Sequence, residues 1–338
     1  MKVLIVRFSS IGDIVLTTPV VRCIAIQTHA EIHYLTKEAF APILTSNPHI
    51  NRVFTIKENL KEVMPQLQHE QYDLIIDLHH NLRTKILKSK LKRPSRSFDK
   101  INVEKWLKVN LKIDWLPTTH IVDRYLKTTK GINVENDGKG LDYFIPDSDV
   151  IEMRKFLNDR NIKNHLCLSV GAAHQTKCLT LEQIIELCNQ IDYPIMLLGG
   201  KSEIEKAKSI GHQVDTHVVN AVNQLSLNQT AASINFSSLL ISHDTGVMHM
   251  GAALKKSMIT IWGNTIPAFG MYPYFGDAEV WHKPIQIEGL SCRPCSKIGY
   301  KKCPKGHFKC IQDISIESIA KLANEKMLQE SNNRSDKA

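Results

Sequence analysis

Three consecutive residues, Asp244, Thr245 and Gly246, have the types and order expected of an anion-binding loop. We expect residues 239–262 to form a strand, this loop, a helix and a second strand, because short β-branched apolar runs flank a helix-like stretch. Asp244 and Thr245 are good helix-capping residues, and Gly246 lets the backbone turn, so free N–H groups should point out of the sheet. The free N–H groups and the partial positive charge at such a helix start favour the binding of a phosphate group. The alternative is that Asp244 only caps the helix and that His249 only packs on it.

Similar polar loops follow three other expected strands, and they contain these side chains: Ser10, Gly12 and Asp13 in the first, His79 and Arg83 in the second, and Lys177 in the third. The first loop lacks the spacing G-x-G-x-x-G, so the dinucleotide fingerprint is absent. Ligands of open α/β sheets bind at the carboxyl ends of the strands, so we expect the four loops to share one crevice. Asn264 and Thr265, which follow the last core strand, should face the same opening.

The elements that carry these loops alternate between strands and helices along the chain. This alternation predicts an α/β fold with doubly wound parallel sheets. It restarts after a turn-rich stretch, which indicates two Rossmann-like domains facing a central cleft. We expect the first domain at 1–155, the second at 156–328 and a frayed polar tail at 329–338.

Composition restricts the class of protein. The chain has 338 residues, of which 43% are hydrophobic and 23% charged, as in a soluble globular protein with more than one core. No apolar run approaches the ~20 residues that span a bilayer, and the apolar run at the N-terminus is too short for a signal peptide. We therefore expect a cytoplasmic protein with mostly reduced cysteines.

The formal net charge is +9, and the excess is concentrated between residues 83 and 112, where eleven Lys or Arg residues accompany only two acids. Such a patch attracts polyanions, including nucleic acid, anionic lipid and phosphorylated sugars. A solvated helix face is the alternative.

Half of the eight cysteines lie within nineteen residues: Cys292, Cys295, Cys303 and Cys310. Their spacing, with His307 nearby, is compatible with a small structural zinc site. An unmetallated or redox-variable cluster is the alternative.

Five segments, in their order along residues 2–314, resemble the bacterial glycosyltransferase family 9, the ADP-heptose:lipopolysaccharide heptosyltransferases. They are KVLIVRFSSIGDIVLTTPVV, YDLIIDLHHNLR, VGAAHQTKCLT, SHDTGVMHMGAAL with ITIWGNTIP after it, and the cluster from CRPC to CPKGHFKC. The resemblance implies a GT-B architecture, with the acceptor site on the N-terminal domain and the nucleotide-sugar site on the C-terminal one. It also implies an inverting, metal-independent transfer of a heptose from ADP-heptose to an anionic, lipid-linked core sugar.

The resemblance gives these residues roles. It implies that Asp13 is the catalytic base, whereas a plain helix cap is the alternative. We expect the donor to contact Lys177, Asp244, Thr245, Gly246, His249, Asn264 and Thr265, and the acceptor to contact Ser10, Gly12, His79 and Arg83. The alternatives are a solvated loop lysine for Lys177, a packed core histidine for His249 and a solvated surface arginine for Arg83.

The expected partners are ADP-heptose, an anionic lipid-linked saccharide and the inner face of the inner membrane, with no nucleic acid, no cofactor in catalysis and a monomeric chain. Two other classes of protein share some of these features. A nicotinamide-dependent oxidoreductase shares the sheets but requires the missing glycine fingerprint. A nucleic-acid-binding protein with a zinc knuckle explains the basic stretch and the cysteines, but it does not explain two phosphate-binding halves.

Overall fold

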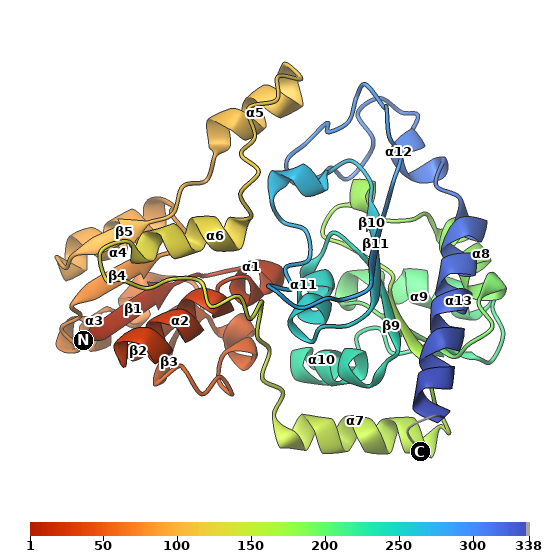
Figure 1. Cartoon of the computed structure of the whole chain (residues 1–338), viewed down its shortest axis with the longest axis horizontal. Helices are drawn as coiled ribbons and strands as arrows, with labels where there is room; N and C mark the ends of the chain where they lie inside the picture. Colours follow the sequence, from red (N-terminus) through yellow and green to blue (C-terminus); the bar gives the residue numbers. More distant parts are fainter. Residues whose placement is uncertain (336–338) are drawn as a thin grey trace.

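The computed structural model describes residues 1–335 and consists of two α/β halves, each built on a parallel sheet (Figure 1). The first sheet has five strands in the order β3-β2-β1-β4-β5, and the second has six in the order β11-β10-β9-β6-β7-β8. All strand pairs are parallel. The predicted pair of doubly wound sheets is therefore confirmed.

The first half contains β1 (Lys2–Val6), α1 (Ile11–Val15), α2 (Thr18–Thr28), β2 (Glu31–Lys37), β3 (Arg52–Ile56), α3 (Met64–His69), β4 (Leu74–Asp77), α4 (Leu82–Leu91), β5 (Ser95–Ser97), α5 (Asn102–Asn110) and α6 (Ile121–Leu126). The second half contains α7 (Asp147–Asp159), β6 (Leu166–Ser169), α8 (Leu181–Gln190), β7 (Ile195–Leu198), α9 (Ile204–Gly211), β8 (Val218–Asn220), α10 (Leu227–Phe236), β9 (Leu239–His243), α11 (Gly246–Ala253), β10 (Met258–Trp262), β11 (His282–Gln286), α12 (Lys309–Gln312) and α13 (Ile316–Ser335). Short 3₁₀ turns lie at Glu38–Ile43, Leu60–Glu62, Lys127–Thr129, Gln175–Lys177, Lys201–Glu203 and Pro267–Phe269.

The central strands are apolar because helices cover both of their faces. Every residue of β4, β6, β7, β9 and β10 is buried. The largest group of contacting buried side chains continues from Val3 in the first sheet to Trp262 in the second, so the two halves share a core at their joint.

Each sheet reverses its strand order once, and this reversal locates the ligand crevice. In the first sheet the reversal falls between β1 and β4, and in the second between β6 and β9. The loops that leave these four strands are those that the sequence singles out. Their meeting point is the joint between the halves, where α1 contacts α11 (Figure 1).

Two glycines allow this contact. A Cβ atom on Gly12 would lie 2.5 Å from Cδ2 of His249, and a Cβ on Gly246 would lie 2.8 Å from Cβ of Ile11. Both separations are shorter than atoms tolerate, so any side chain here would push α1 and α11 apart.

Some elements differ from the prediction. The sequence favours a strand at 141–145 and a helical region at 84–131. No strand forms at 141–145, and the region at 84–131 is divided among α4, β5, α5 and α6. Helix α7 crosses the predicted boundary at 155 and packs against α10 of the second half. Helix α13 extends to Ser335, so residues 329–335 are helical rather than frayed, and residues 336–338 lie outside the described part of the chain.

One helical stretch, Ile11–Thr28, is long and apolar enough by composition to cross a membrane, with a mean hydropathy of 1.3. In the structure 67% of it is buried, which is the position of a core helix. The stretch is divided into α1 and α2, with Pro19 in the first turn of α2, where proline is tolerated.

Candidate active site

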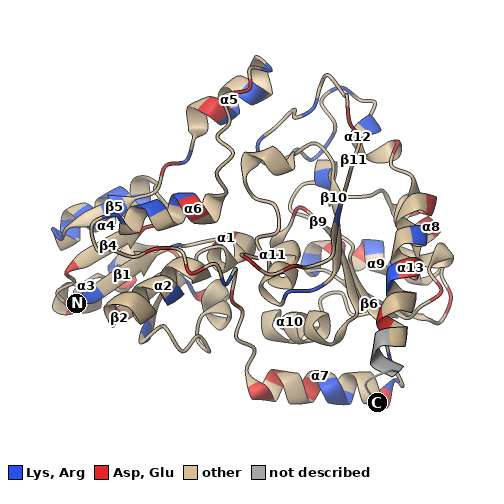
Figure 2. Ribbon diagram, in the orientation of Figure 1, with Lys and Arg blue, Asp and Glu red and all other residues tan. Residues whose placement is uncertain are grey.

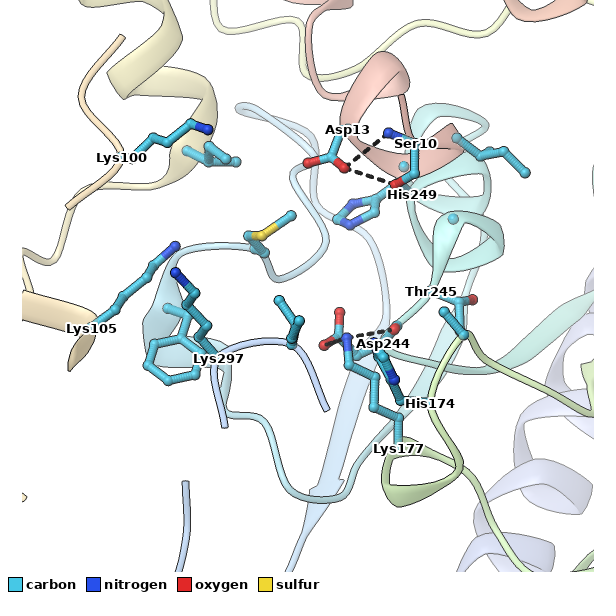
Figure 3. Close-up of a pocket in the computed structure, with 18 of the residues that line it drawn as sticks. Ser10, Asp13, Lys100, Lys105, His174, Lys177, Asp244, Thr245, His249 and Lys297 are labelled. Atoms are coloured by element: carbon cyan, nitrogen blue, oxygen red, sulfur yellow. Dashed lines mark hydrogen bonds and ion pairs between the residues drawn. The ribbon is translucent and has the colours of Figure 1, made fainter. Parts of the chain in front are cut away.

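A cavity of about 620 Å³ lies between the two halves, and the loops after β1, β4, β6 and β9 contribute to its walls (Figure 3). It brings together nine of the residues predicted from the sequence: Ser10, Gly12, Asp13, His79, Lys177, Asp244, Thr245, Gly246 and His249. The predicted shared crevice therefore exists.

Asp13 occupies the first half's side of the cavity, in the short helix α1. Its Oδ1 lies 2.7 Å from Nη2 of Arg7, and its Oδ2 accepts hydrogen bonds from the Ser10 amide at 3.1 Å and the Ser10 hydroxyl at 2.7 Å. Burial by itself would raise the pKa of Asp13, but the Arg7 charge and the Ser10 donors outweigh it, so the pKa is lowered. Asp13 is therefore an oriented carboxylate, ionised at neutral pH. Asp13 also forms a capping box with Ser10 at the start of α1, so it combines the base geometry with the helix-capping role that was its alternative.

Arg7 was not singled out from the sequence, although it holds Asp13 in place. It directly follows β1, and its guanidinium donates to the carbonyl of Leu78 at 2.5 Å, the carbonyl of Ser9 at 2.7 Å and the hydroxyl of Tyr125 at 3.2 Å. These bonds fix the ends of β1 and β4 relative to each other. The sequence feature that could have identified Arg7 is its position, because it is a single cation between a buried strand and a polar loop.

Lys177 and Asp244 face Asp13 from the second half (Figure 3). The Lys177 Nζ lies 2.6 Å from Oδ2 of Asp244, and the Thr265 hydroxyl donates to the same oxygen at 2.9 Å. Both charged side chains are largely buried, with 15% and 13% of their surfaces exposed. Asp244 therefore orients the ammonium rather than capping the helix, and Thr265 acts through Asp244 because it does not line the cavity.

Helix α11 begins at the cavity wall with Thr245 as its N-cap residue, and no side chain among the described residues caps its first turn. The amide groups of this turn are therefore left for a ligand at the cavity wall, as an anion site requires. His249, one turn further, is 2% exposed, and its Nδ1 has no hydrogen-bond partner among the described residues. Burial lowers the pKa of His249 to about 4, so its ring is neutral beside Gly12.

His79 lines the cavity as predicted, whereas Arg83 and Asn264 do not. Burial, with the nearby Arg7 charge, lowers the pKa of His79 to about 4. Arg83 lies at the start of α4 with its guanidinium 5.3 Å from the Phe8 ring centroid, outside the cavity. Asn264 lines a smaller cavity among the cysteines, so neither Arg83 nor Asn264 borders the central cavity, and their substrate contacts stay predictions.

Four further cations line the cavity: Lys100 and Lys105, which belong to the basic stretch at 83–112, and Arg124 and Lys297, which the sequence did not single out. Lys100 precedes α5, Lys105 belongs to α5, and Lys297 comes from the cysteine-rich loop of the other half. All three ammonium groups lie on the side of the cavity away from Lys177 (Figure 3). Burial, with Arg124 and Lys297 nearby, lowers the pKa of Lys105 to about 8. With Arg7 and Lys177, six cations and two carboxylates line the cavity, which favours anionic ligands.

The four clustered cysteines and His307 surround one small cavity of about 10 Å³. The cysteines are free thiols, and Sγ of Cys292 lies 3.7 Å from Nε2 of His307. Both amide atoms of Asn264, which lines the same cavity, are buried and lack a partner within the described chain. Across the described residues, only Glu31, His33 and Glu70 have three metal-ligating atoms within 4.8 Å of one another. The cysteine sulfurs are thus more widely spaced than a bound ion would hold them, and the zinc site stays a prediction.

Two facing doubly wound sheets with an anion-binding cleft between them are the GT-B architecture of nucleotide-sugar-dependent glycosyltransferases. The chain belongs to glycosyltransferase family 9 (heptosyltransferase), whose model matches residues 61–296. The predicted family is therefore confirmed, and the protein is a glycosyltransferase rather than an oxidoreductase or a nucleic-acid-binding protein.

Individual relatives agree with this assignment. The lipopolysaccharide heptosyltransferase 1 of Campylobacter coli is 26% identical over 352 aligned residues, which cover 96% of this chain and 98% of the relative. A glycosyltransferase family 9 structure from Veillonella parvula has a TM-score of 0.77 at 21% identity and covers 97% of each chain. The ADP-heptose lipopolysaccharide heptosyltransferase II of Escherichia coli has a TM-score of 0.75 at 18% identity, over 98% of this chain and 100% of that one.

Proposed function

We propose that this protein transfers a heptose from ADP-heptose to an anionic, lipid-linked sugar of the lipopolysaccharide core, with inversion at the anomeric carbon and without a catalytic metal. The observation that carries the proposal is the position of Asp13 across one cavity from Lys177 and the uncapped start of α11. The family and its lipopolysaccharide heptosyltransferase members support the sugar and the acceptor class.

In the proposed reaction, the acceptor hydroxyl oxygen forms a bond to the anomeric carbon while the bond from that carbon to the diphosphate oxygen breaks. The electron pair leaves with ADP, and the hydroxyl proton passes to the Asp13 carboxylate. Because the pKa of Asp13 is lowered, the proton moves late in the step, when the attacking oxygen has become acidic. One in-line displacement inverts the configuration.

Positive charge for the departing diphosphate comes from the protein. Lys177 supplies an ammonium fixed by Asp244, and the first turn of α11 supplies N–H donors and the positive end of the helix dipole. The two carboxylates that line the cavity are both paired, Asp13 with Arg7 and Asp244 with Lys177. Each of these carboxylates is thus already neutralised by a cation of the protein, which supports the metal-independent mechanism.

The acceptor would lie toward Lys100, Lys105 and Lys297, whose ammonium groups suit carboxylate or phosphate groups on a core sugar. We also propose that the protein acts as a monomer. The lipid-linked acceptor would place the protein in the cytoplasm, at the inner face of the inner membrane.

The test is a donor screen with a panel of nucleotide sugars and a lipopolysaccharide-core acceptor, with the released nucleotide identified by mass spectrometry. We expect ADP release from ADP-heptose only when the acceptor is present, and NMR should show the inverted anomer in the product. Titrations with ADP, NAD and a short oligonucleotide at moderate salt complete the experiment. Oligonucleotide binding without ADP binding would refute the proposal.

A further inference from the structure

A short hairpin in the first half projects away from the body of the molecule at α5 (Figure 1). Helix α5 contains no buried residue. Within residues 102–116, which we call the α5 hairpin, five large apolar side chains are exposed: Val103, Trp106, Leu111, Ile113 and Trp115. The two indoles are 55% and 69% exposed. Apolar side chains gathered in this way on one projection mark an interaction surface rather than ordinary surface variation.

The cysteine-rich loop of the second half, residues 289–312, has a related composition. It exposes Ile298 and Tyr300. It contains six cations and no acid: Arg293, Lys297, Lys301, Lys302, Lys305 and Lys309. The last four are exposed and have no ion-pair partner among the described residues. Figure 2 shows basic residues both on α5 and on this loop.

The α5 hairpin and the cysteine-rich loop contact each other and border the same cavity. The Lys112 Nζ donates to the carbonyl of Pro294 at 2.7 Å and to that of Cys292 at 3.1 Å. Lys105 and Asn102 of the hairpin line the cavity, as do Lys297 and Ile298 of the loop. The α5 hairpin and the cysteine-rich loop therefore form one continuous rim beside the cavity.

We propose that this rim docks on an anionic lipid bilayer, with the α5 hairpin in the head-group region and the lysines of the cysteine-rich loop against anionic head groups. Tryptophan favours the membrane interface, and cations beside an apolar tip add attraction to acidic lipids. A nucleic-acid surface would depend mainly on its cations, whereas the α5 hairpin exposes five large apolar side chains beside its lysines. The docked rim would present the cavity to a lipid-linked acceptor, a consequence that rests on the proposed function.

The experiment measures co-sedimentation of the full chain with phosphatidylcholine vesicles that do or do not contain phosphatidylglycerol. We expect binding to the anionic vesicles that weakens as salt rises, and at least about tenfold weaker binding for the double variant Trp106→Ala/Trp115→Ala. Ile151→Ala is the matched control, because Ile151 is equally exposed but lies on α7 at the far end of the molecule. Thermal unfolding confirms that each variant is folded.

Equal binding of wild type to neutral and anionic vesicles, or of the double variant and wild type to anionic vesicles, overturns the proposal. So does oligonucleotide binding that is lost in the double variant while vesicle binding is absent. Activity adds a second readout. With a delipidated soluble acceptor, the double variant should keep its kcat/KM, whereas with a vesicle-embedded acceptor it should lose about tenfold. Failure of transfer with every acceptor, while vesicle binding persists, refutes only the proposed function.

Discussion

Replacing Asp13 by asparagine is the most direct test of the proposed catalytic base. The asparagine keeps the size of the side chain and an oxygen for the Ser10 donors, but it removes the proton acceptor and the negative charge. A general base contributes about 10²- to 10⁴-fold to a rate, so kcat should fall by that factor, equivalent to about 3–5 kcal/mol in the activation barrier. ADP binding should change little, because Asp13 lies across the cavity from Lys177.

The same substitution also leaves Arg7 without its counter-charge, so stability must be separated from catalysis. Arg22 and Asp137 provide a comparison pair, with Asp137 17% exposed and Asp13 20% exposed, and this second pair lies away from the cavity. Removal of one partner of a partly buried ion pair costs up to about 3 kcal/mol of unfolding free energy. Because Arg22 also pairs with Asp142, we expect Asp13→Asn to lower the melting temperature at least as much as Asp137→Asn does.

Single-turnover kinetics and ADP calorimetry then distinguish the two variants. Only Asp13→Asn should lose turnover, and both should bind ADP. If Asp13→Asn transfers sugar at a rate close to that of Asp137→Asn, Asp13 is not the base and the reasoning from its geometry is wrong.

The pH dependence gives an independent measurement of the same group. Because the Arg7 charge lowers the pKa of Asp13, the acidic limb of kcat/KM should lie below the ordinary titration range of an aspartate. Arg7→Gln removes that charge, so the pKa rises and the limb moves to higher pH. The lowered pKa also stabilises the fold above the pKa of the unfolded state, and this contribution is lost as the pH falls through the folded value. An unmoved limb in Arg7→Gln would show that another group controls it.

Three further variants test other parts of the site. Lys177→Met should weaken ADP binding by about 10- to 100-fold in calorimetry, because it removes the cation beside the diphosphate; unchanged affinity would contradict the donor assignment. Gly12→Ala should lower kcat and the melting temperature, because its Cβ would meet His249 at 2.5 Å, whereas Gly211→Ala, with no atom within 4 Å, should change neither. Elemental analysis should find about one zinc per chain in wild type and none in Cys303→Ser; a metal-free wild type with full stability rules the zinc site out.

The sequence predicted the elements whose signal is local. The sequence favours a strand at 258–262 and a helix that follows Thr180 and ends at Gln190. Strand β10 and helix α8 have these bounds, because buried apolar runs and an N-cap threonine define them within the segment itself. Strands β5 and β11 were not predicted, because Ser95–Ser97 is wholly polar and the edge strand His282–Gln286 contains a lysine and a proline. Hydrogen bonds to the neighbouring strands β4 and β10 hold these segments in strand form. The residues of the segments themselves do not indicate that such a neighbour exists.

The residues of the candidate site likewise fall into two groups, those that local sequence predicts and those that it does not. Ser10, Asp13, Lys177 and the loop before α11 were predictable because each follows a strand, and parallel topology brings strand ends to one edge. Lys105 and Lys297 reach the cavity through a helix and a loop that connect no neighbouring strands of one sheet. Their position depends on how the two halves meet, and that information is not local.

The charge distribution also indicates what the lysines far from Lys177 would contribute to the proposed reaction. A nucleotide diphosphate and an acidic acceptor repel each other, and the repulsion grows where water is excluded. In that reaction Lys177 and α11 would compensate the donor side, because the Arg7 charge is already shared with Asp13. Lys100, Lys105 and Lys297 would then compensate the acceptor. Burial lowers the pKa of Lys105 to about 8, so we expect an anion bound beside its ammonium to raise that pKa and to couple acceptor binding to proton uptake above neutral pH.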